Sequence, residues 1–131
     1  MSQYLLDTSA YSRFASVGGS AKAAIESAES LTINVVALGE LRGGYRAGSR
    51  AGMNEADLRD FLQAAEVRVV PITEATADLY AQIWADQRRH GRMLPTNDIW
   101  IAATAIEHGL VVLTGDRHFG EVEGLEVELL A

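Results

Sequence analysis

The 131-residue chain contains no cysteine, which excludes disulfide bonds, thiolate zinc sites and cysteine nucleophiles. It has only two prolines and is 48% hydrophobic, so we expect a folded protein. Its apolar runs fall short of the roughly 18–20 residues that cross a bilayer. Residues 1–4 lack the basic stretch that begins a secretory signal. These absences predict a single cytoplasmic domain, residues 1–131, with no membrane association.

Lysine is almost absent as well, because ten of the eleven basic residues are arginine and Lys22 is the exception. The formal net charge of -7 argues against nucleic-acid binding, which usually requires a basic surface. The arginines nevertheless cluster, and two interpretations are open. They are either solvated helix faces or a rim that contacts phosphates, since guanidinium groups bind phosphate in a bidentate manner. The clusters are Arg42, Arg46 and Arg50, and Arg88, Arg89 and Arg92.

Short apolar segments alternate with helical patterns along the whole chain. Nearly continuous apolar strands separated by helices predict an α/β fold, a three-layer sandwich with a mostly parallel central sheet flanked by helices. We expect strands at 3–6, 31–35, 67–71, 110–114 and 125–129. We expect helices at 8–17, 20–28, 36–47, 54–66, 73–90 and 98–108.

Finer features of the helices can also be predicted. Ser20, Asn54 and Asn97 are suited to capping helix N-termini, and Gly109 to ending the helix at 98–108. Both tryptophans are expected on buried helix faces. In the helix at 73–90, the spacing assigns one face to Ala77, Tyr80, Ala81 and Trp84.

Four acidic residues fall where such a sheet binds ligands, at the carboxyl ends of its strands. Asp7 follows the first strand and Asp116 follows the strand at 110–114. Glu40 lies in the first turns of the helix after the second strand, and Asp98 begins the last helix. We therefore expect all four carboxylates at one edge of the sheet.

Taken singly, each acid has an ordinary structural interpretation that stays open. Asp7 is placed to cap a helix, Asp98 suits a helix N-terminus, Asp116 suits a turn, and Glu40 suits a solvent-facing helix position. Taken together, four converging carboxylates repel one another unless a cation lies among them. Oxygen ligands without cysteine favour Mg²⁺ or Mn²⁺, and such a metal supports phosphodiester hydrolysis.

Polar neighbours could orient these ligands, and the histidines are less informative. Hydroxyl and amide side chains flank the acids at Thr8, Ser9, Asn97 and Thr114. The three histidines, by contrast, lack metal-ligand spacing and suit structural roles, although His118 is near enough to Asp116 to contact a substrate. They are His90, His108 and His118.

The segments that carry the acids, taken in order, resemble the PIN-domain ribonucleases, and among them the VapC-type toxins of bacterial toxin–antitoxin pairs. The segments are LLDTS at 5–9, VALGEL at 36–41, NDIWIAATA at 97–105 and LTGDRHF at 113–119. The resemblance spans essentially the whole chain and implies a PIN fold. It implies an Mg²⁺- or Mn²⁺-dependent endoribonuclease in which Asp7, Glu40, Asp98 and Asp116 are the catalytic metal ligands.

The resemblance also implies partners. The protein would be the toxin of a type II system with RNA as its substrate, inhibited by a small cognate antitoxin whose C-terminal segment enters the acidic groove. It would form a homodimer, or a larger hetero-oligomer with the antitoxin. One departure from the family pattern concerns the metal: residues 117–120 are not acidic, and Glu121 is the first acid after Asp116. We therefore expect one metal and leave a second open.

Two other functions are weighed against this one. The alternative is a non-catalytic PIN-like module that binds RNA or a protein, and the complete set of four acids argues against it. A receiver-like phosphate-transfer domain is disfavoured because no Asp-x-Asp follows the first strand and Lys22 is the only lysine.

Overall fold

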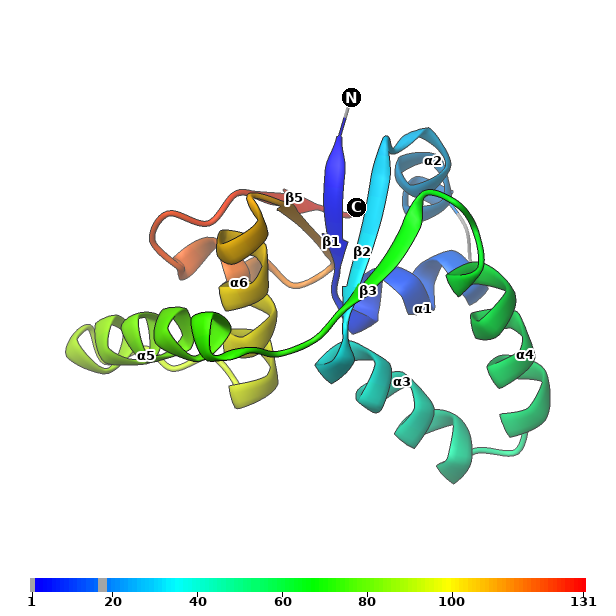
Figure 1. Cartoon of the computed structure of the whole chain (residues 1–131), viewed down its shortest axis with the longest axis horizontal. Helices are drawn as coiled ribbons and strands as arrows, with labels where there is room; N and C mark the ends of the chain where they lie inside the picture. Colours follow the sequence, from blue (N-terminus) through cyan, green and yellow to red (C-terminus); the bar gives the residue numbers. More distant parts are fainter. Residues whose placement is uncertain (1, 17–18) are drawn as a thin grey trace.

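A computed structural model describes residues 2–16 and 19–131 of the chain, in which strands and helices alternate (Figure 1). The strands are β1 (Gln3–Leu6), β2 (Ser30–Asn34), β3 (Val67–Val70), β4 (Val111–Thr114) and β5 (Val127–Leu129). The helices are α1 (Thr8–Ser16), α2 (Gly19–Ser27), α3 (Val35–Ala47), α4 (Ala51–Leu62), α5 (Glu74–Arg89), α6 (Thr96–His108) and the 3-10 helix η1 (Arg117–Glu121). Within the described ranges, none of the helices has both the length and the apolar character that crossing a membrane requires.

The five strands form one sheet in the order β3-β2-β1-β4-β5, and every neighbouring pair is parallel. The prediction of a mostly parallel sheet is therefore confirmed. Because all strands run the same way, their carboxyl ends meet at a single edge. The residues that follow β1 and β4 and the start of α3 after β2 all lie along this edge.

Two hydrophobic clusters cover the two faces of the sheet and make the fold a three-layer sandwich. On β1, Tyr4 and Leu6 pack into one cluster with residues of α1, α2 and α4, whereas Leu5 packs into the other with residues of α5 and α6. Figure 1 shows α5 and α6 on one side of the sheet and α1, α2 and α4 on the other. Both faces are buried, which explains why the strands contain few polar residues.

Three predicted helix caps are wrong. Ser20 lies inside α2, which begins at Gly19. Asn54 lies inside α4, because its N–H donates to the Arg50 carbonyl at 3.0 Å, and α4 ends at Leu62 rather than 66. Asn97 lies inside α6, where Pro95 takes the cap position with a φ of -54° that suits a helix start. The predicted end of the first helix, at residue 17, lies outside the described residues.

The predicted buried face of α5 is also wrong, because the helix buries two polar side chains. Thr76 donates to Glu107 at 2.6 Å, and the Gln87 Oε1 accepts from the Leu94 N–H at 2.7 Å. These bonds satisfy groups that would otherwise be costly to bury, so the helix turns Trp84, which is 37% exposed, toward solvent. The buried residues of α5 are Thr76, Ile83 and Gln87.

Candidate active site

Asp7 is buried at the end of β1, with 5% of its surface exposed. Its Oδ1 accepts from the Ser9 hydroxyl at 2.7 Å and the Ala10 N–H at 2.8 Å, and its Oδ2 accepts from the Thr114 hydroxyl at 2.5 Å. Burial raises the pKa of Asp7, and these hydrogen bonds oppose that effect by stabilising the carboxylate. The bond to Ala10 also caps α1, so the capping interpretation of Asp7 is correct.

Two hydroxyl groups connect the ends of β1 and β4. The Thr114 hydroxyl donates to Asp7 and accepts from the Asp116 N–H at 2.9 Å. The Ser9 hydroxyl donates to Asp7 and accepts from the Gly115 N–H at 3.0 Å. The backbone that carries Asp116 is thus fixed relative to the Asp7 carboxylate. Orientation of this kind is the role that sequence reasoning predicted for Ser9 and Thr114.

Glu40 lies on the exposed side of α3 but does not project freely into solvent. Its Oε1 accepts from the Thr8 hydroxyl at 2.7 Å, and its Oε2 accepts from the Asn97 amide at 3.2 Å. Thr8 is adjacent to Asp7 in the sequence, and Asn97 is adjacent to Asp98. The Glu40 carboxylate therefore joins α1, α3 and α6 at the edge of the sheet.

Asp98 lies in the first turn of α6 and has a raised pKa. Burial raises its pKa to about 6, with added contributions from the negative charges of Asp7, Glu40 and Asp116. The three negative charges are near enough to disfavour ionisation of Asp98, and their effect is smaller than that of burial. Asp98 thus shares its electrostatic environment with Asp7, Glu40 and Asp116, and a common metal site for the four stays a prediction.

Asp116 caps η1 and contacts a histidine. Its Oδ1 accepts from the His118 N–H at 2.9 Å and lies 2.8 Å from the His118 Nδ1. The turn interpretation of Asp116 is therefore correct. The contact also gives His118 a local structural role. The negative charge of Asp116 contributes to the raised pKa values of Asp7 and Asp98.

The donor chemistry at this edge fits a hard divalent cation, although the carboxylates are not gathered around one point. Among residues 2–16 and 19–131, no three acids or histidines are arranged so that they could hold a metal ion. Asp7, Glu40 and Asp116 instead accept hydrogen bonds from nearby protein groups. Like charges remain apart unless a cation draws them together, and all four candidates offer the oxygen atoms that Mg²⁺ and Mn²⁺ prefer.

Several clustered arginines have partners within the chain. The Arg42 Nε lies 3.1 Å from Glu55, and Arg89 forms an ion pair with Asp86. The Arg88 guanidinium stands 5.3 Å from the centre of the Trp84 ring. These contacts account for part of the arginine charge, and binding of RNA phosphates by the clusters stays a prediction.

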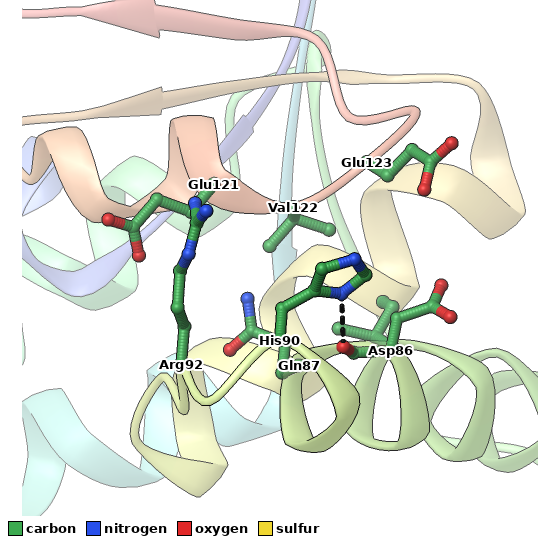
Figure 2. A pocket seen from close by; sticks show the side chains of 8 residues that line it. Asp86, Gln87, His90, Arg92, Glu121, Val122 and Glu123 are labelled. Atoms are coloured by element: carbon green, nitrogen blue, oxygen red, sulfur yellow. Dashed lines mark hydrogen bonds between the residues drawn. The ribbon is translucent and has the colours of Figure 1, made fainter.

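A pocket of about 210 Å³ lies between the end of α5 and η1 (Figure 2). Its lining includes Asp86, Gln87, His90 and Arg92, but none of the four predicted ligands. The His90 Nδ1 lies 2.7 Å from the Asp86 carbonyl oxygen, so this histidine is engaged in capping α5. The candidate active site is therefore identified by its charge and hydrogen bonding rather than by this pocket.

Two residues near the site were missed by sequence reasoning. Arg13 on α1 donates to the Ala131 carbonyl at 3.2 Å, and its guanidinium lies over Gly115, where a Cβ would stand 2.5 Å from the guanidinium carbon. No sequence pattern relates these distant residues. Asn34 caps α3 through its side chain, and an asparagine at a strand end before a helix is a usable capping signal.

Comparison with known proteins identifies the family of the chain. Residues 4–125 match the PIN domain family. The chain is 34% identical over 95 residues to ribonuclease VapC4 of Mycobacterium tuberculosis, which covers 72% of this chain and 73% of VapC4.

Solved structures show the same fold over nearly the whole chain. DNA-bound VapBC from Salmonella typhimurium matches with a TM-score of 0.83 and 25% identity, covering 98% of both chains. VapBC-5 of M. tuberculosis, from the VapBC family of toxin-antitoxin systems, matches with a TM-score of 0.75 and 28% identity, covering 99% of this chain and 98% of the other. The chain therefore belongs to the PIN-domain family, among the VapC-type ribonucleases.

Proposed function

We propose that this protein is the toxin of a type II toxin–antitoxin pair and that it cuts RNA with the help of a divalent cation. The observation that carries the proposal is the hydrogen bonding at the carboxyl edge of the sheet, where Thr114 holds Asp7 and where Thr8 and Asn97 hold Glu40 beside Asp7 and Asp98. Raised carboxyl pKa values, as at Asp7 and Asp98, are typical of functional sites. The similarity to VapC4, a ribonuclease, supports RNA as the substrate.

In this proposal Asp7, Glu40, Asp98 and Asp116 hold one Mg²⁺ or Mn²⁺. When bound, the metal supplies a water of lowered pKa and stabilises charge on a phosphoryl oxygen. The hydroxyls of Ser9 and Thr114 fix the orientation of the Asp7 carboxylate, and Thr8 and Asn97 fix the orientation of the Glu40 carboxylate. Hydrolysis breaks the P–O bond of the RNA backbone and adds water across it.

The experiment compares RNA cleavage by the wild type and by Asp98→Asn, in Mg²⁺ and in Mn²⁺, with a chelator as a further arm. Asp86→Asn is the matched control, since Asp86 lies on α5 in an ion pair with Arg89. Removing a residue that only hydrogen-bonds to a metal ligand lowers metal affinity or activity by roughly 10- to 100-fold. We therefore expect Asp98→Asn, which removes a proposed ligand, to lower the rate of RNA cleavage by more than about a hundredfold. Full cleavage by Asp98→Asn, or in excess chelator, would refute the proposal.

The alternative function remains a PIN-like module that binds RNA or a protein without cutting. One observation favours it: within the described ranges, no three acids or histidines are arranged to hold a metal ion. Under this alternative, the wild type would bind RNA with the same affinity with and without Mn²⁺ and would leave it intact. The cleavage assay therefore separates the two functions.

A partner and an oligomeric state are part of the proposal. VapBC-5, which this chain resembles, belongs to a toxin-antitoxin system. With a net charge of -7, this chain favours a small antitoxin with a basic segment, and we propose a cytoplasmic homodimer that assembles with it. Co-purification with the product of a short neighbouring reading frame, and inhibition of RNA cleavage by that product, would test this partner. An adjacent product that neither binds nor inhibits would contradict it.

A further inference from the structure

Asn34 is completely buried at the point where β2 ends and α3 begins. Its side-chain Oδ1 accepts from the Ala37 N–H at 2.9 Å and so caps α3. Any small polar residue could provide this cap. The second polar atom of the side chain has a different partner, on another helix.

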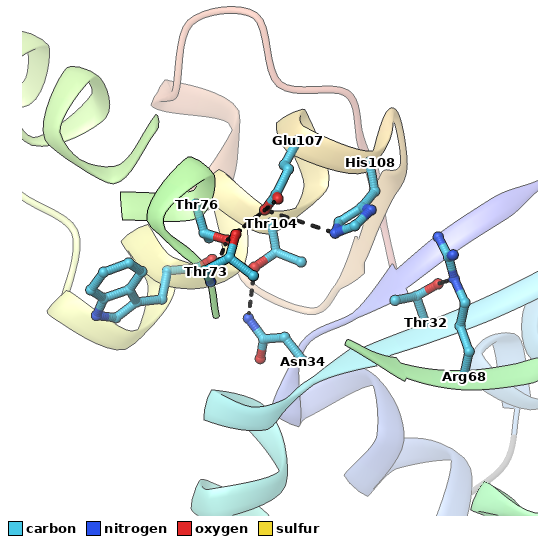
Figure 3. A network of polar contacts seen from close by, with 9 residues as sticks. Thr32, Asn34, Arg68, Thr73, Thr76, Thr104, Glu107 and His108 are labelled. Atoms are coloured by element: carbon cyan, nitrogen blue, oxygen red, sulfur yellow. Dashed lines mark hydrogen bonds and ion pairs between the residues drawn. The ribbon is translucent and has the colours of Figure 1, made fainter. Parts of the chain in front are cut away.

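The Asn34 amide donates to the Thr104 hydroxyl on α6 at 3.0 Å (Figure 3). Thr104 is also completely buried, and its hydroxyl donates to the Trp100 carbonyl at 2.8 Å. The bond between Asn34 and Thr104 ties the start of α3 to the middle of α6, and the bond from Thr104 to Trp100 orients the Thr104 hydroxyl. Breaking one would leave a buried amide without a partner, which proteins rarely tolerate.

The two helices joined in this way are the ones that carry Glu40 and Asp98. A second bond, from Asn97 to Glu40, joins the same helices at 3.2 Å but is exposed to solvent, where water competes for both groups. The buried Asn34–Thr104 bond is therefore the firmer of the two connections. None of the four carboxylates takes part in it.

We propose that Asn34 and Thr104 are positioning residues that set the spacing of Glu40 and Asp98, and thereby the affinity for the divalent cation. The inference rests on the proposed function. It gives a role at the site to Asn34 and Thr104, which the sequence had indicated only as parts of a strand and of a helix. A metal site requires its ligands to be held closely by supporting hydrogen bonds. We therefore expect metal affinity to depend on this buried bond.

Thr104→Val tests the proposal because valine keeps the shape but removes the hydroxyl, while the cap from Asn34 to Ala37 remains. Thr104→Ser restores the hydroxyl. Thr32→Val is the matched control: Thr32 is equally buried, and its hydroxyl accepts from the Arg68 Nε at 3.1 Å, joining β2 to β3 (Figure 3). That bond touches neither acid-bearing helix.

The readout is Mn²⁺ affinity measured by calorimetry under conditions where every variant is folded. We expect Thr104→Val to weaken binding by about tenfold or more, while Thr32→Val and Thr104→Ser stay close to the wild type. Equal Mn²⁺ affinity in Thr104→Val and Thr32→Val would overturn the inference. If Thr104→Val does not fold, Asn34→Asp is used instead, because it keeps the cap acceptor and removes the donor, and an unchanged affinity there overturns the inference equally.

The wild type separates this inference from the proposed function. A wild type that binds Mn²⁺ and cuts RNA, with no difference among the variants, overturns only the positioning role. A wild type that neither binds Mn²⁺ nor cuts RNA overturns the proposed function and this inference with it.

Discussion

Asp98→Asn should make the metal-free protein more stable at alkaline pH. The pKa of Asp98 is raised from its ordinary value of 3.8 to about 6, so the folded state disfavours the ionised carboxylate. Stability is therefore lost as pH rises from about 3.8 to about 6, and the loss persists above pH 6. Below pH 3.8 the carboxyl is protonated in both the folded and the unfolded state, and the loss disappears.

The size of the effect follows from the pKa difference. For a fully buried group, a rise in pKa from 3.8 to about 6 would lower the free energy of unfolding by about 3 kcal/mol. Asp98 is only partly buried, so solvent screening reduces this to about 1–2 kcal/mol. For a domain of this size, that is a rise of roughly 3–8 °C in melting temperature for Asp98→Asn at pH 8. The amide is nearly isosteric with the carboxyl, so packing should change little.

Urea unfolding of both proteins at pH 8 and at pH 3.5, in the presence of a chelator, measures this difference. We expect Asp98→Asn to exceed the wild type at pH 8 and to match it at pH 3.5. Adding Mn²⁺ should reverse the order at pH 8, because the metal stabilises only the protein that binds it. A stability difference that is the same at both pH values, or a less stable Asp98→Asn at pH 8, would refute the electrostatic reasoning.

Two further predictions concern the neighbours of the site. Thr114→Val removes the hydroxyl that donates to Asp7. We expect the variant to lose about 1–3 kcal/mol in free energy of unfolding. The loss should be greater at pH 8 than at pH 4, because the Asp7 pKa rises further without this bond, and urea unfolding at both pH values measures it. Equal losses at the two pH values would contradict that role. Charge reversal at Arg88 and Arg92 should weaken RNA binding. It should also make the slope of the logarithm of the binding constant against the logarithm of the salt concentration shallower, by up to about 0.7 for each phosphate that the variant no longer neutralises. Binding titrations at several salt concentrations give that slope, and an unchanged slope would return these arginines to the solvated-face interpretation.

The position of the site could be predicted from the sequence because it depends on chain topology. Asp7 and Asp116 follow apolar strands, and parallel strands bring such positions to one edge whatever the details of packing. Asp98 and Glu40 could be placed through the helices that follow the same pattern. The ordinary interpretations were also correct for Asp7 and Asp116, since a carboxylate can cap a helix and still lie beside other charges.

The predictions that failed concern features that helical periodicity and simple capping preferences do not capture. The buried face of α5 was wrong because Thr76 and Gln87 find partners on other segments, and periodicity counts only apolar residues. The cap at Asn97 was wrong because Pro95 favours the earlier helix start. Asn34 was correctly assigned to a strand, but its bond to Thr104 on α6 could not be read from the local sequence.

RNA cleavage by this protein should require one divalent cation held by these carboxylates. The most direct test follows Mn²⁺ binding and RNA cleavage in the same titration, for the wild type and for Asp7→Asn. We predict that binding and cleavage by the wild type reach half-saturation at the same Mn²⁺ concentration, and that both are lost in Asp7→Asn. Cleavage that proceeds without bound Mn²⁺ or another divalent ion, or that survives in Asp7→Asn, would contradict the account.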